Sequence, residues 1–103
     1  MSESLDKATP LELDMLILQK KISQGDLEDI GVFSEDILNR SRTNNERDHL
    51  IEARVRMERA LLGLIDINSV GNELRWCVDR LNALCPGSPL HGLALLNLAN
   101  WHR

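Results

Sequence analysis

The side chains best suited to chemistry are the cysteines and histidines, and their spacing matches no known kind of site. Cys77 and Cys85 are separated by eight positions; on one helix, at about 1.5 Å per residue, their Cα atoms would be roughly 12 Å apart. Because a disulfide needs Cα atoms within about 7 Å, we expect two reduced thiols. Zinc ligands usually come as closely spaced pairs, which His49, His91 and His102 do not provide. We therefore expect no metal ion and no other cofactor.

The charged residues also lack the arrangement of a catalytic centre. On one predicted helix, Glu52 and Arg56 have the i,i+4 spacing that stabilises a helix surface by about a few tenths of a kcal/mol. An acid/base pair would instead need one carboxylate with a raised pKa in an enclosed pocket. The sequence contains no nucleophile elbow, P-loop or dinucleotide-binding glycine motif. We expect a non-catalytic protein, and we interpret the arginine-rich stretch 40–59 as a solvated surface, or else as a rim that orients an oppositely charged partner.

Composition restricts the class of partner. The chain has 103 residues, 43% of them hydrophobic, and a formal net charge of -4, which suits one folded domain with a modest core. The only aromatic residues are Phe33, Trp76 and Trp101, too few for a platform that stacks nucleic-acid bases. The mild acidity argues against binding of a phosphate backbone. No apolar run approaches the ~20 residues that span a membrane, and the start lacks a basic signal segment. We expect a cytoplasmic protein with no nucleic-acid partner and no membrane insertion.

Start and stop residues delimit the first predicted helix. The sequence Thr-Pro-Leu-Glu at 9–12 has the form of a capping box with proline at the first helical position. Gly25 is a natural C′ residue, so this helix is predicted over 10–24. We expect residues 1–8 to be a frayed tail and residues 9–103 to form a single helical domain.

Four more helices follow in the prediction. The second begins at Asp26 and carries an interior Gly31, where a break is the alternative, with Ser34 starting a shorter helix. A polar loop at 41–45 separates it from the later ones. The apolar periodicity predicts these over 46–65, from Val70 to the Cys85-Pro86 stop, and over 89–103 after the cap Ser88. No strand-like alternation occurs, so the predicted fold class is all-α.

The junction between the last two predicted helices carries a family resemblance. In the stretch 81–99 a helix ends near Pro86 and the next begins at once at Pro89, which resembles the junction between tetratricopeptide repeats. The turn at 24–29, Gln-Gly-Asp-Leu-Glu-Asp, is similar to the turn inside such a repeat. The resemblance implies antiparallel helix pairs in a short solenoid of about five helices; an irregular helical bundle is the alternative. In size, acidity and helical content the chain also resembles cytoplasmic chaperones of type III secretion needle subunits.

The first and last predicted helices are more apolar than one buried face requires. We expect the first helix to contact neighbours on two sides. The last is apolar nearly all round, and such a helix is normally buried. Either another chain covers it, or the first helix packs back over it.

These features predict a protein–protein interaction module, either a chaperone or an adaptor. It would bind an amphipathic helix of a partner protein in an apolar groove and so mask that helix. The partner could be a component of a secretion system. Assembly into a homo- or hetero-oligomer is part of this prediction. The resemblance implies that the first helix of each pair lines the groove, with the inward positions Met15, Gln19, Ile22, Arg56, Arg59, Leu93, Asn97 and Trp101.

Two alternatives stay open. The first concerns function: a small regulatory inhibitor of the anti-sigma or antitoxin kind, or a DNA-binding accessory domain, is the competing class. The second concerns Trp101. As a large and partly exposed aromatic it would be a binding hot spot, but it could equally pack as core on Leu98 and Ile17.

Overall fold

Successive antiparallel helices make up the part of the chain that the structure describes, residues 8–102 of a computed structural model. The helices are α2 (Pro10–Gln24), α3 (Leu27–Arg40), α4 (Glu46–Leu61), α5 (Val70–Leu84) and α6 (Pro89–Trp101), with a 3-10 turn η1 (Ile67–Ser69) before α5. No strand occurs between residues 8 and 102, so the all-α prediction is confirmed. The predicted tail, apart from Ala8, lies outside the described residues.

The predicted caps form the helix ends. The Thr9 hydroxyl accepts a hydrogen bond from the Glu12 amide at 3.1 Å, and the Glu12 carboxylate accepts one from the Thr9 amide at 2.9 Å. Gly25 ends α2 in a left-handed conformation with φ 84°, where glycine meets no steric penalty. At the start of α6 the Ser88 hydroxyl accepts from the His91 amide at 3.1 Å. These local hydrogen bonds fix where α2 and α6 begin along the chain.

One helix boundary differs from the prediction, and the alternative of a break at Gly31 is wrong. Helix α3 runs through Gly31 without a break, and Ser34, instead of starting a new helix, is buried and donates its hydroxyl to the Gly31 carbonyl at 3.1 Å. Helix α4 ends at Leu61, not at 65. Gly63 has φ 76°, and the Leu64 amide donates to the Arg59 carbonyl at 2.9 Å, the 6→1 bond of a Schellman motif. The apolar periodicity continues past this glycine and conceals the stop.

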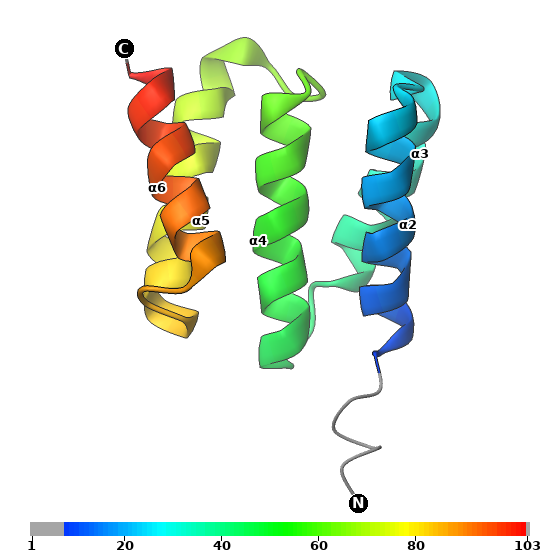
Figure 1. Ribbon diagram of the computed structural model, residues 1–103, viewed down its shortest axis with the longest axis horizontal. Coiled ribbons are helices and arrows are strands. Elements are labelled where there is room, and N and C mark those ends of the chain that lie inside the picture. Colours follow the sequence, from blue (N-terminus) through cyan, green and yellow to red (C-terminus); the bar gives the residue numbers. More distant parts are fainter. Residues whose placement is uncertain (1–7, 103) are drawn as a thin grey trace, which may run out of the picture.

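Helices α2, α4 and α6 run side by side in the same direction, with α3 and α5 behind them (Figure 1). Helix α2 packs against both α3 and α4, as expected for a helix with two neighbours, and α6 packs against α5. Because α4 stands between α2 and α6 (Figure 1), the alternative in which the first helix covers the last is wrong.

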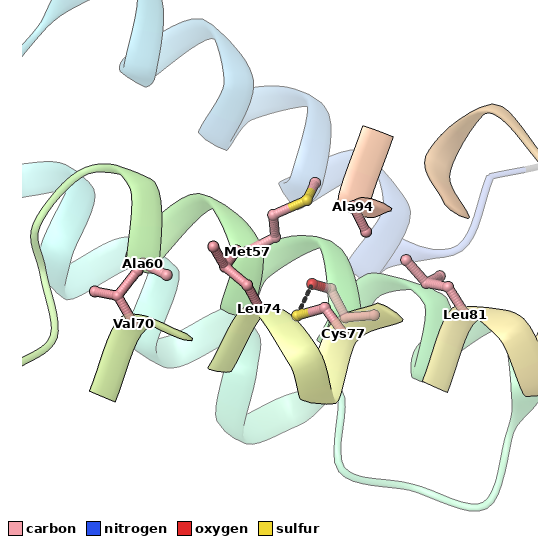
Figure 2. Packing of buried hydrophobic residues seen from close by; sticks show 8 residues of the cluster. Met57, Ala60, Val70, Leu74, Cys77, Leu81 and Ala94 are labelled. Atoms are coloured by element: carbon pink, nitrogen blue, oxygen red, sulfur yellow. Dashed lines mark hydrogen bonds between the residues drawn. The ribbon is translucent and has the colours of Figure 1, made fainter. Parts of the chain in front are cut away.

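The core consists of two clusters that share α4. The first joins α4, α5 and α6 through Ala53, Met57, Ala60, Val70, Leu74, Cys77, Leu81 and Ala94 (Figure 2). The second joins α2, α3 and α4 through Leu11, Met15, Leu18, Ile30, Ile37, Ile51 and Val55. Different faces of α4 thus belong to different clusters, and this helix connects the two halves of the fold.

The two thiols are free and differ in environment. Cys77 is fully buried, and its thiol donates to the Ala53 carbonyl at 3.3 Å (Figure 2). Burial, with a further contribution from Glu73, raises the pKa of Cys77 to about 12. Cys85, at the end of α5, is partly exposed and accepts a hydrogen bond from the Ser88 hydroxyl at 3.2 Å. As expected from their spacing, Cys77 and Cys85 are not joined by a disulfide.

This difference predicts the reactivity of the native protein toward a thiol reagent. At pH 8 Cys85 is expected to react readily, whereas Cys77 reacts only on unfolding, because it is both inaccessible and held as the neutral thiol. A chromogenic disulfide reagent should therefore detect one reactive thiol per chain in the native protein and two in denaturant. Cys85→Ser should abolish the native reaction; an unchanged native reaction in that variant would contradict the burial of Cys77.

Candidate binding groove

A groove crosses the face formed by α2, α4 and α6. It consists of two cavities of about 440 and 170 Å³ that share Leu50, Arg54 and Leu90 as lining residues. The larger cavity lies between α4 and α6 and is completed by Cys85, Ser88, Pro89 and Leu93. The smaller one extends to α2 and is completed by Glu12, Met15, Arg47 and Ile51. The lining is mostly apolar, with arginine as its only basic side chain.

Helix geometry places these residues. Arg47, Leu50 and Arg54 recur at intervals of three and four along α4, so they lie on one face. The cap at Ser88 starts α6 beside this face, and Leu90 and Leu93 lie within its first turns. The stop at Pro86 and the cap at Ser88 thus decide which part of α6 borders α4.

An ion pair closes one end of the groove. Arg47 of α4 binds the Glu12 carboxylate of α2, with its Nε donating to Oε2 at 3.0 Å. The hydrogen bond from Arg47 and the one from the Thr9 amide hold the pKa of Glu12 below its usual value. This pair links α2 to α4, and each charge is balanced by the other.

Arg54, in contrast to Arg47, forms no ion pair within the described residues. Its Nε is shielded from solvent and has no hydrogen-bond partner within residues 8–102. In the same part of the chain every ion pair of α4 involves Arg47, Glu52 or Arg56, and none involves Arg54. Among the charged residues that line the groove, Arg54 is therefore the one without an ion-pair partner in the described part of the chain.

Two of the residues predicted for the groove, Met15 and Leu93, line its cavities. Gln19, Ile22 and Asn97 do not belong to the lining. Asn97 follows Leu93 by one turn and donates its amide to the Met57 sulfur of α4 at 3.4 Å. On α2, Gln19 is partly exposed and Ile22 packs against the second core cluster.

Arg56 and Arg59 lie on the opposite side of α4, so the structure does not bring them together with the other predicted positions. Arg56 is bound to Glu73 of α5 and lies 3.5 Å from the centre of the Trp76 ring. Arg59 donates to the Gly31 carbonyl at 3.0 Å and to the Ser34 hydroxyl at 2.7 Å, both on α3. The interpretation of these arginines as a solvated surface is wrong, because both are partly buried where α3, α4 and α5 meet.

Trp101 lies at the far end of α6. It lines a separate cavity of about 320 Å³ together with Leu61, Ile67 and Val70. A Cβ atom added at Gly71 would be 3.1 Å from the indole Nε1, so this glycine leaves room for the ring. The alternative of core packing on Ile17 is wrong, since Ile17 is on α2, on the other side of α4 (Figure 1). Because 42% of its surface is exposed, Trp101 is only partly covered by the rest of the domain.

Sequence reasoning missed Leu50 and Arg54 as groove residues. Leu50 belongs to the apolar pattern of α4, and that pattern alone indicates a core position. Arg54 carries no local sign of its role, because only the approach of α6 encloses it.

Apolar side chains remain uncovered on both outer helices. Leu13, Leu16 and Ile17 of α2 and Leu95 and Leu96 of α6 are each at least 46% exposed. The expected excess of apolar surface is therefore present on α2 and α6.

Residues 8–102 contain no group of three or more histidine, cysteine, aspartate or glutamate side chains placed to hold a metal ion. None of the described helices has the length and apolar character needed to cross a membrane. Comparison of the chain with protein-family models, curated proteins and solved structures finds no significant match.

Proposed function

We propose that this protein is a non-catalytic interaction module that binds an amphipathic helix of a partner protein along the groove between α2, α4 and α6. The observation that carries the proposal is the pair of joined apolar cavities on this face, which share Leu50, Arg54 and Leu90. Apolar cavities of several hundred Å³ that converge on a few polar groups are typical of binding sites.

The shape of the site favours a helical ligand. The groove follows α4 for two turns, from Arg47 to Arg54, and α2 and α6 run parallel to α4 on either side of it (Figure 1). A helix in such a groove inserts side chains at i, i+3 or i+4, and i+7. Masking these side chains until the partner reaches its destination is the action of a chaperone or adaptor.

The partner's apolar anchors would fill the cavity at Leu50, Leu90 and Leu93. Leu93 is 39% exposed, so its contact with the domain itself is incomplete. Contact with a ligand would remove this surface from water, which is favourable by roughly 25 cal/mol per Å² of apolar area.

A matched pair of substitutions on α6 tests the proposal. Leu93 and Leu95 are both exposed, at 39% and 46%, but only Leu93 lines the groove. A displayed library of randomised helical peptides, selected on the wild-type protein, should yield ligands that Leu95→Glu still binds and Leu93→Glu does not. Circular dichroism should show both variants folded, since neither side chain is core.

The result also separates the competing classes of function. If no peptide is enriched, or if Leu93→Glu binds the selected peptides as well as Leu95→Glu does, the groove is not a peptide site. Duplex DNA offered in the same assay should not bind; binding that is lost steeply between 50 and 200 mM salt would indicate a phosphate-backbone contact instead.

A further inference from the structure

We infer that the helix bound in this groove carries an acidic side chain opposite Arg54. The inference rests on the proposed function and specifies the chemistry of its ligand. It starts from the position of Arg54, whose Nε is already shielded from solvent by the groove walls and unbonded within residues 8–102.

The cost of covering this guanidinium determines what can bind. In the free protein Arg54 is partly exposed, and the exposed part of its side chain is in contact with water. A ligand that closed the groove with apolar groups alone would remove that water and leave a charge with no partner, which is strongly unfavourable. A carboxylate on the ligand replaces the lost water with charge-assisted hydrogen bonds, which arginine forms in a bidentate geometry.

The protein's own carboxylates do not satisfy Arg54. Glu12 lines the same groove but is bound to Arg47. Glu58 is one turn further along α4, yet none of the ion pairs among the described residues joins it to Arg54. The groove therefore has an excess of one positive charge, placed between the apolar positions Leu50 and Leu90.

This arrangement gives the groove selectivity as well as affinity. A ligand with leucine-like anchors and one glutamate or aspartate within a turn of them fits both the cavity and the charge. A purely apolar helix would leave Arg54 unpaired, and a basic one would be repelled, so both are disfavoured. Such discrimination would distinguish one amphipathic helix from the many that a cell contains.

The peptide selection described above tests the inference when it is repeated with Arg54→Met and Arg54→Glu as additional baits. Wild-type protein is expected to enrich an acidic residue at one fixed spacing from the apolar anchors. Arg54→Met should lose that enrichment while still selecting the anchors, and Arg54→Glu should select lysine or arginine at the same position. For one selected peptide, replacing the acid by glutamine should weaken binding to wild type at least tenfold and leave binding to Arg54→Met nearly unchanged.

The experiment distinguishes a failure of the inference about Arg54 from a failure of the proposed peptide-binding function. Peptides that require Leu93 but show no acidic position, or the same acidic position with all three baits, would overturn the inference and leave the groove as a peptide site. Sedimentation analysis tests whether a second copy of the chain occupies the groove instead. If the wild-type protein is a dimer that excludes the peptides, and if Leu93→Glu dissociates this dimer, the groove is the interface between two copies and the inference is overturned. Failure to enrich any peptide would reject the proposed function itself.

Discussion

Replacement of Arg56 by methionine is expected to lower the free energy of unfolding by about 2–3 kcal/mol, whereas Arg54→Met should change it by less than about 0.5 kcal/mol. The two arginines lie on the same helix, two positions apart, and methionine keeps most of the apolar stem of each. Arg56 is bound to Glu73 and lies 3.8 Å from the carboxylate of Glu52, which is only 8% exposed. Without it Glu52 keeps a single cationic neighbour, Arg42, also at 3.8 Å.

Thermal and urea denaturation of the two variants measures this contrast. Because 1 kcal/mol shifts the melting temperature of a domain of this size by roughly 4–8 °C, Arg56→Met should melt about 10–20 °C below wild type. Arg54→Met serves as the control for loss of one positive charge from α4. Equal losses in the two variants would show that net charge, and not the contacts with Glu52 and Glu73, determines the effect.

The contrast also explains which part of the site was predictable. The start of α4 could be predicted, because the Asn45 side chain caps it by accepting from the Arg47 amide at 2.8 Å. The direction in which each α4 side chain points follows, in the sequence analysis, only from the resemblance to tetratricopeptide repeats. An error of two positions rotates a residue by about 200° around a helix. This is the rotation that separates Arg54 in the groove from Arg56 on the opposite side.

On α6 a local feature determines the register. The cap at Ser88 fixes the first turn, and Leu93, Asn97 and Trp101 then follow at intervals of four along the side of α6 toward α4 and the start of α5. For α4 the decisive contacts are with residues distant in sequence, Ser34 and Glu73. Spacing within one helix reveals i,i+4 pairs such as Glu52–Arg56 but not which of them a neighbouring helix will cover.

Replacement of Leu74 by alanine is expected to have the largest effect on stability, a loss of about 3 kcal/mol. Leu74 is fully buried in the first core cluster, among residues of α4, α5 and α6 (Figure 2). Its truncation removes buried methyl groups and leaves a cavity that packed neighbours fill only in part. Leu96→Ala is the matched control, since Leu96 is 56% exposed and its truncation should cost less than about 0.5 kcal/mol.

Amide hydrogen exchange in Leu74→Ala also tests whether the two clusters unfold together. Helix α4 contributes Met57 to the first cluster and Val55 to the second, so the loss of one cluster removes the surface on which the other packs. We therefore expect the slowest amides of α2 and α3 to lose as much protection as those of α5, although Leu74 does not belong to their cluster. If α2 and α3 kept wild-type protection while α5 exchanged faster, the halves would unfold separately. The groove would then join two units that move relative to each other, because α2 lines it from one unit and α6 from the other.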